Sequence, residues 1–432
     1  MNTNLNVNEK KYIFYILFGF FSCMPLISIK GYTIFIWLSG VFIIMSIIEG
    51  IMKDDFGKYR SYCNWYLLIV IFSIISAVIC LTSSMVEKWK VNQLKNLVLV
   101  IIYYLIFVIF ASDNTSKKAI YFLKGLYYSA IFQVLWGGMQ LLFYKKGLLL
   151  NDIVFIDILH MANESVTQIK DTGIALSGLC WNAANMAALT VFGYIYTKKN
   201  YIKIMFIIFS IICGNRTVLI GIVIAVMLEV LWNFLIDNLK IRYEWLVTLT
   251  VFGLLVAIFM VFNSDIRNAL LNKAQSIVNI FSLSTIKTQG SASIHSRYLT
   301  SVPQLLKRSS IEHCLFGYGL GNSGYPFTEY LGQWNWLDLD AWVVECQHID
   351  WLWSTGIVGF VLNLSWLVFY MYKGGKSGHG KKMMLFLAVV LIQGFFYNII
   401  FNWCLIDIMC IIVVFENKRQ LYQPLSSAYT NS

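Results

Sequence analysis

Charged residues are scarce in this chain of 432 residues. Asp, Glu, Lys and Arg together make up 13% of it, about half of the ~25% that is usual in soluble globular proteins. Hydrophobic residues make up 58%, and the mean hydropathy is +0.67. This composition excludes a set of ordinary soluble domains. Because apolar runs of about 20 residues, each long enough to cross a bilayer, recur from end to end, the sequence predicts an all-α, polytopic integral membrane protein.

Signatures of soluble metal and redox sites are absent as well. There is no C-x-x-C pair and no Cys/His spacing typical of a structural metal site. Most of the nine cysteines lie in apolar runs, where cysteine behaves as a small hydrophobic residue. Cys314 and Cys346 instead fall in a long loop, and a disulfide between them is left open. No small-residue cleavage site follows the first apolar run, so we expect a spanning helix there and not a cleaved signal peptide.

The apolar runs predict about twelve transmembrane helices. Each of the pairs around 202–236 and 383–416 can be miscounted by one crossing. The predicted spans are 12–29, 32–52, 64–82, 97–112, 120–143, 178–196, 202–213, 217–236, 244–263, 350–372, 383–399 and 400–416.

The net charge of +11 does not indicate nucleic-acid binding, because the basic residues are scattered over short segments between helices. If the N-terminus is cytoplasmic, 18 Lys and Arg residues fall in cytoplasmic segments and 8 in short outer segments. This bias follows the positive-inside rule. We therefore expect both termini to face the cytoplasm.

This topology divides the chain into three parts. Residues 1–263 form about nine N-terminal transmembrane helices, and residues 350–432 form about three more with a cytoplasmic tail. Between them, residues 264–349 form a large extracytoplasmic loop containing short helices. Loops of this length are usually functional, so we expect the chemistry or binding to face outside.

Two arginines are candidates for holding an anion. In "CGNRT", Arg216 opens a helix, where the partial positive charge of the helix end makes a cation unfavourable unless an anion lies nearby. It either reaches a lipid headgroup or joins the helix end in binding a phosphate. In "HSRYLTSVPQLLKR", the second candidate, Arg297, lies on an amphipathic helix of the large loop. The same helix also carries Arg308. A solvated helix face is the alternative for these two residues.

His348 is the candidate catalytic base. It lies at the start of the helix that leaves the large loop, in "ECQHIDWLWSTGIVGF". A helix N-terminus disfavours the imidazolium form, so the ring would stay neutral and accept a proton. Glu345 and Asp350 are close enough in sequence to orient it. A structural polar role is the alternative for the histidine, as it is for Asn185, whose amide at the end of another helix needs a partner.

Five pieces of the sequence, taken in order, resemble the O-antigen ligase/polymerase superfamily, which contains Wzy-type polysaccharide polymerases and O-antigen ligases. The chain departs from the usual pattern at Ala184, Asn215 and Ile349, and the first five helices carry no motif of the family. The matching pieces, which span about 178–362, are "SGLCWNAAN", "GNRT", "HSRYLTSVPQLL", "GYGLGN" and "HIDWLWSTGIVG".

The resemblance implies a polysaccharide (O-antigen) polymerase of the bacterial inner membrane. Such an enzyme transfers an undecaprenyl-diphosphate-linked oligosaccharide to the acceptor sugar of another lipid-linked repeat unit at the outer face. Arg216 and Arg297 would bind the diphosphate, and His348 would be the base. Asn185, Asp350, Glu345 and Arg308 would support them. We expect no cofactor and no metal, because no outer loop offers a DxD-type or His/Asp ligand cluster.

Two other functions remain open. One is an O-antigen ligase that transfers the polymer to a lipid A-core acceptor. The other is a transporter or flippase of the lipid-linked sugar, which would be expected to show internal repeats and midplane charges that are rare here. Membrane lipids and a chain-length regulator protein are the expected partners. The sugars, the linkage and the kind of polysaccharide cannot be read from the sequence.

Overall fold

The computed structural model is helical in almost all of the part that it describes. Two short antiparallel pairs, β1 with β2 and β3 with β4, are the exceptions among the described residues. The described residues are 12–29, 32–53, 59–83, 85–162, 165–167, 169–170, 173–180, 185–235, 290–331, 344–377, 380–400 and 403–427.

The described elements form an N-terminal group and a later group along the chain. The N-terminal elements are α2 (Ile13–Ser22), β1 (Ser28–Ile29), β2 (Tyr32–Thr33), α3 (Ile34–Lys53), α4 (Asn64–Thr82), α5 (Glu87–Ser112), α6 (Lys117–Tyr144), α7 (Leu150–Asp152), β3 (Ile169–Lys170) and β4 (Gly173–Ile174). The later elements are α8 (Asn185–Tyr196), α9 (Asn200–Ile212), α10 (Arg216–Leu235), α13 (Gly290–Arg308), α14 (Ile311–Phe316), α15 (Tyr325–Leu331), α16 (Gln347–Gly375), α17 (Lys381–Gln393) and α18 (Trp403–Ser427).

Four of the described helices are long and apolar enough to cross a membrane, which supports the predicted transmembrane character. They are Ile34–Met52, Ser61–Thr82, Glu87–Ser112 and Gln347–Gly375. A described helix overlaps eleven of the twelve predicted spans, and the predicted span 244–263 lies outside the described residues. The number of crossings stays a prediction.

Three helices are shorter than the sequence predicted. The helices α2, α8 and α17 have 10, 12 and 13 residues, or roughly 15–20 Å at 1.5 Å per residue, against a hydrocarbon core of about 30 Å. The predicted continuous helices over 12–29, 178–196 and 383–399 are therefore wrong at one end each, since α2 ends at Ser22 and residues 28–29 form β1. Gly178 has a positive φ of 61°, which ends regular structure before α8. The chain turns after Gln393.

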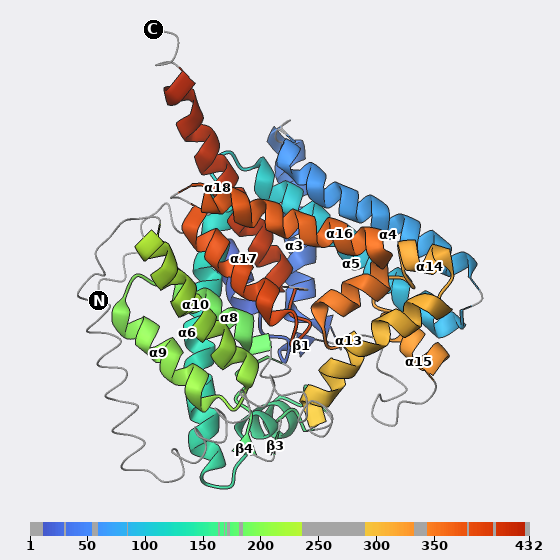
Figure 1. Cartoon of the computed structure of the whole chain (residues 1–432). Coiled ribbons are helices and arrows are strands. Elements are labelled where there is room, and N and C mark those ends of the chain that lie inside the picture. Colours follow the sequence, from blue (N-terminus) through green and yellow to red (C-terminus); the bar gives the residue numbers. More distant parts are fainter. Residues whose placement is uncertain are drawn as a thin grey trace.

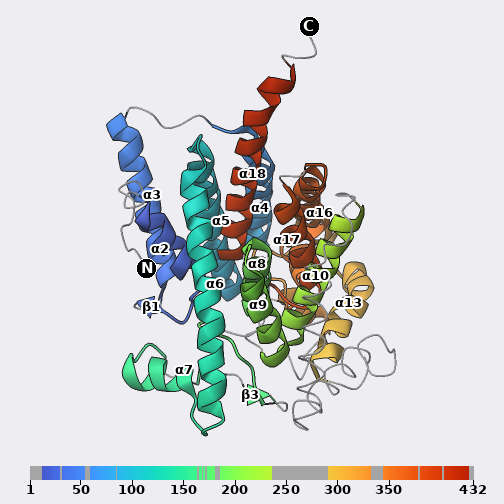
Figure 2. The ribbon, with the colours of Figure 1, turned by 90° about the vertical axis from the view of Figure 1, so that its left-hand side faces the viewer.

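The helices α8, α10 and α17 pack side by side and form one bundle with two distinct ends. One end carries the starts of α8 and α10 and the end of α17. The opposite end carries the end of α8, the start of α9 and the start of α17. In Figure 2, α7 and β3 lie at the lower end of the molecule, and the C-terminal end of α18 lies at the upper end.

This two-ended arrangement leads to a topology prediction. We expect residues near 117, 199 and 376 to be cytoplasmic and residues near 290 and 330 to be outside, because basic residues gather in the former segments. Single cysteines at these positions, in a Cys314→Ser background, are treated with a membrane-impermeant maleimide in spheroplasts. The background removes the one half-buried native thiol, since the other eight are buried. Labelling of a cysteine at position 376 from outside would refute the topology.

Candidate functional site

His348 lies where the start of one helix meets the end of another. It is in the first turn of α16 and is 8% exposed. Its Nε2 atom is 2.9 Å from the carbonyl oxygen of Leu391, in the last turn of α17. The ring of Phe395 packs against the imidazole with the ring centroids 4.1 Å apart. These contacts hold the histidine in one orientation.

The Leu391 carbonyl also determines which ring nitrogen is basic. A carbonyl oxygen only accepts hydrogen bonds, so Nε2 carries the hydrogen and donates it. In the neutral ring the lone pair is then on Nδ1. Among the described residues, Leu391 supplies the one hydrogen bond that the ring makes. Nδ1 is therefore the ring atom that can accept a proton.

A glycine after α17 allows the two helix ends to approach closely. The backbone N–H of Gln347 donates to the carbonyl of Gly394 at 2.9 Å. A Cβ atom at Gly394 would lie 3.2 Å from both the Gln347 Cβ and the His348 Nε2 atoms. The Gln347 side chain accepts from the backbone N–H of Ile400 at 2.7 Å. The turn after α17 thus positions the start of α16 through these contacts, and we call this turn the His348 support.

The start of α10, which carries Arg216, is joined to the same support. Asn215 caps this helix, since its Oδ1 atom accepts from the backbone N–H of Thr217 at 2.8 Å, as a serine at this position would. The Nε2 atom of Gln393 donates to the carbonyl of Thr217 at 3.1 Å. Gln393 directly precedes Gly394, so one glutamine connects the backbone at Arg216 to the His348 support. The side chain of Arg216 lies outside those described.

The helix α13, which carries Arg297, runs beside the start of α16. Tyr298 is 2% exposed, and its hydroxyl accepts a hydrogen bond from the backbone of Glu345. Its ring packs edge-to-face on Phe327 with the centroids 5.5 Å apart. Tyr298 also belongs to one apolar cluster with Cys346, whose thiol is free like that of Cys314. The side chain of Arg297 lies outside those described, but its backbone position brings a third predicted piece to this region.

Asp350 does not orient the histidine as the sequence predicted. Its Oδ1 atom accepts from the hydroxyl of Ser354 and its Oδ2 atom from the amide of Asn398, both at 3.1 Å. No hydrogen bond joins Asp350 to His348, both of which the structure describes. Residues two apart on a helix face different sides, which explains the separation. Asp350 instead ties the start of α16 to the segment between α17 and α18.

Two more of the supporting residues, Glu345 and Arg308, are exposed and make no hydrogen bond to the imidazole. Glu345 is exposed, just before α16 begins. Arg308 is exposed at the last residue of α13 and donates to the backbone carbonyl of Tyr330. It lies eleven residues beyond Arg297, or about 16 Å along the helix. Arg308 therefore holds α13 to α15.

The glycine-rich piece "GYGLGN" packs against a break in α16, beside α14 (Figure 1). Gly356 has φ 68° and ψ −177° inside this helix. The backbone carbonyls of Trp353 and Ser354, just before this break, accept hydrogen bonds from outside the helix. The backbone N–H of Tyr318 donates to Trp353 at 2.7 Å, and that of Gly319 donates to Ser354 at 3.1 Å. The glycine loop thus replaces the helical hydrogen bonds and fixes the short helical segment that carries His348.

Substituting Gly356 by alanine should destabilise this arrangement. A Cβ atom there would lie 2.2 Å from the carbonyl oxygen of Leu315, and the backbone conformation alone costs about 1–3 kcal/mol for a residue other than glycine. We expect a lower melting temperature and less folded protein in detergent. Gly138→Ala is the matched control, because nothing lies within 4 Å of its Cβ position. Equal melting temperatures for the two variants would contradict this role.

The first predicted piece, "SGLCWNAAN", lies next to the start of α10. The backbone N–H of Leu176 donates to the carbonyl of Cys213 at 2.9 Å. Two buried side chains form hydrogen bonds with the backbone of Gly178. Its N–H donates to Gln140 at 3.0 Å, and its carbonyl accepts from Asn151 at 2.9 Å. Asn185 is the first residue of α8 and is half-buried. Residues 181–184 lie outside the described part.

Sequence reasoning missed the groups on α17 and after it that hold the site. Leu391, Gln393 and Gly394 contact His348 or join it to α10, and Asn398 binds Asp350. The sequence signal for this arrangement was the presence of two amide side chains, Gln393 and Asn398, inside the apolar run 383–399. Polar groups at membrane depth require partners, so their presence pointed to a polar junction.

Among the described residues, no group of three or more His, Cys, Asp and Glu side chains could hold a metal ion. No protein-family model matches the chain, and no curated protein is similar enough in sequence to be reported as a relative.

Proposed function

We propose that this protein is a polysaccharide polymerase of the bacterial inner membrane. It joins oligosaccharide repeat units carried on undecaprenyl diphosphate, at the outer face. The observation that carries the proposal is the meeting of four helix segments at one place. At the end of α17, Gln393 contacts the start of α10 and Leu391 contacts the start of α16. Tyr298 joins the Arg297 region of α13 to the backbone just before α16.

The reaction needs a base and a site for a leaving diphosphate. The acceptor hydroxyl attacks the anomeric carbon of the donor sugar, and its proton passes to Nδ1 of His348. The bond from that carbon to the diphosphate breaks, and the electron pair leaves with undecaprenyl diphosphate. Two guanidinium groups, Arg216 and Arg297, stabilise the developing charge with paired N–H donors. The helix start at Arg216 adds its own partial positive charge.

The alternatives use the same region differently. A ligase would bind a lipid A-core acceptor in place of a second lipid-linked repeat, and a flippase would need no base. The neutral imidazole with a lone pair on Nδ1, held by a backbone carbonyl, favours a transfer reaction over transport.

A deletion strain distinguishes these functions. Loss of the surface polysaccharide ladder with one repeat unit still attached to the core means polymerase. Loss of every attached repeat means ligase, and an accumulation of lipid-linked repeats on the cytoplasmic side means flippase. Either of the last two results would overturn the proposal.

A further inference from the structure

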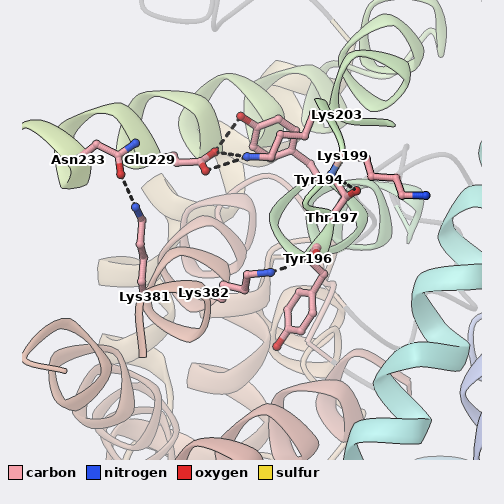
Figure 3. Close-up of polar contacts among 9 residues, drawn as sticks. All are labelled: Tyr194, Tyr196, Thr197, Lys199, Lys203, Glu229, Asn233, Lys381 and Lys382. Carbon is pink, nitrogen blue, oxygen red and sulfur yellow. Dashed lines mark hydrogen bonds and ion pairs between the residues drawn. The ribbon is translucent and has the colours of Figure 1, made fainter. Parts of the chain in front are cut away.

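A cluster of lysines occupies the end of the bundle opposite His348. Lys199 lies between α8 and α9, Lys203 lies in the first turn of α9, and Lys381 and Lys382 open α17 (Figure 3). Lys198 directly precedes Lys199 and is exposed. Nine residues separate Lys382 from Leu391, which places this cluster about 14 Å along α17 from the histidine contact. The lysine cluster is therefore a second polar region, separate from the candidate catalytic site.

Among the described residues, one carboxylate, Glu229, lies within the lysine cluster and forms an ion pair with one of the lysines. Glu229 on α10 accepts from Lys203 at 2.8 and 2.9 Å and from the hydroxyl of Tyr194 at 3.0 Å. The ammonium of Lys203 also lies 4.8 Å from the centre of the Tyr194 ring. This pair is half-buried, with exposed side-chain fractions of 11% and 17%. Glu229 thus forms an ion pair with Lys203.

Among the described residues, the neighbouring Lys382 makes its hydrogen bond with a neutral partner. Its Nζ atom donates to the carbonyl of Tyr196, the last residue of α8, at 3.0 Å. The charged form of Lys382 is unfavourable at this position. Burial, together with repulsion from Lys198 and Lys203, outweighs the attraction of Glu229 and lowers the pKa of Lys382 to about 8. The position at a helix start adds to the cost for a cation. An anion placed between these lysines would remove much of this penalty.

The surface beside the lysine cluster is apolar and exposed. Tyr201, Ile208 and Ile212 lie on one face of α9 and are 65%, 43% and 39% exposed. The ammonium of Lys199 lies 5.7 Å from the centre of the Tyr201 ring. A tyrosine next to lysines, followed by an apolar stripe, is typical of the membrane–water interface. The acyl chains of a lipid could lie along this stripe while its headgroup reaches the lysines.

We propose that the lysine cluster binds the phosphate group of an anionic phospholipid in the adjacent leaflet. Lys198 and Lys382 supply the charge that Glu229 does not neutralise, and the exposed face of α9 receives the acyl chains. This site does not depend on the proposed catalysis, because it lies at the other end of the bundle. By the predicted topology the leaflet is the cytoplasmic one, where basic pockets between helices recognise anionic headgroups.

The test measures lipid binding by the purified full-length protein. Delipidated protein is titrated with phosphatidylglycerol or with phosphatidylcholine of the same acyl chains, and bound lipid is counted by native mass spectrometry. We expect preferential binding of phosphatidylglycerol. The double variant Lys198→Gln/Lys382→Gln should bind it roughly thirtyfold more weakly, from about 1 kcal/mol for each lysine near the surface. The double variant Lys145→Gln/Lys146→Gln, which changes two exposed lysines after α6, should bind like the wild type.

Three outcomes would overturn the proposal. The first is equal affinity of the wild type and the Lys198→Gln/Lys382→Gln variant for phosphatidylglycerol. The second is no preference of the wild type for phosphatidylglycerol over phosphatidylcholine. The third is displacement of the lipid by equimolar inorganic phosphate, which would make free phosphate the ligand. If the double variant fails to fold, the single change of exposed Lys198 to glutamine still tests the site, with an expected loss of roughly fivefold.

Discussion

The variant His348→Ala should lose polymer formation while still binding the lipid-linked donor. A general base contributes roughly 10²–10⁴-fold in rate, enough to remove a ladder of long chains from a gel. The imidazole is held by Leu391 and Phe395, so its removal takes away the Nδ1 lone pair and little of the surrounding structure. The rate is measured with purified protein, normalised to the folded fraction.

A structural role for the histidine predicts a different result. The amount of folded protein would fall, and the remaining activity would scale with that amount. The pH profile separates the two cases further. Protonation of a catalytic ring removes its acceptor, so the rate should fall on the acid side of about pH 6.5, the ordinary value for histidine. A normal rate in a well-folded His348→Ala variant would exclude the base.

The second large effect concerns the two arginines. Arg216→Lys and Arg297→Lys should each lose most of the activity while the protein still reaches the membrane. Lysine keeps the charge but not the two parallel N–H donors that match a diphosphate, and loss of a hydrogen bond to a charged group costs about 1.5–3 kcal/mol, or roughly 10–150-fold in rate.

Arg308→Lys is the matched control for these two variants, because Arg308 lies about 16 Å along α13 from Arg297 and a lysine at this position can still donate to the Tyr330 carbonyl. Its activity should stay close to that of the wild type. Near-normal activity of both Arg216→Lys and Arg297→Lys would reduce these arginines to topological or surface charges. Strong inhibition by a chelator would show that a metal takes part in the reaction.

The helical class and most helix positions were predictable, because long apolar runs specify membrane-spanning helices. The starts of α10 and α16 were predicted to within three residues, since Arg216 and His348 directly follow breaks in hydropathy. What the sequence could not predict was the partner of each polar group. Leu391 lies 43 residues from His348 in the sequence and contacts it through its backbone carbonyl. Because every residue has such a carbonyl, the side chain at position 391 does not reveal this contact.

Local spacing was also misleading at Asp350. Asp350 was expected beside the imidazole because it is two residues away, yet it binds Asn398, which is 48 residues away. The glycines of "GYGLGN" pack on the break at Gly356, and the sequence did not predict this contact. A Cβ atom at Gly317 would lie 2.6 Å from the backbone nitrogen of Gly356. Such backbone-to-backbone contacts depend on the tertiary fold.

Reconstitution tests the central proposal most directly. The purified protein is placed in proteoliposomes with a synthetic undecaprenyl-diphosphate-linked repeat unit as donor and acceptor, in the presence of a chelator. The account predicts lipid-linked products that are longer by whole repeats, with one undecaprenyl diphosphate released for each bond formed, and no such products with the His348→Ala protein. Unchanged substrate with the wild type, or equal elongation by the His348→Ala protein, would contradict it.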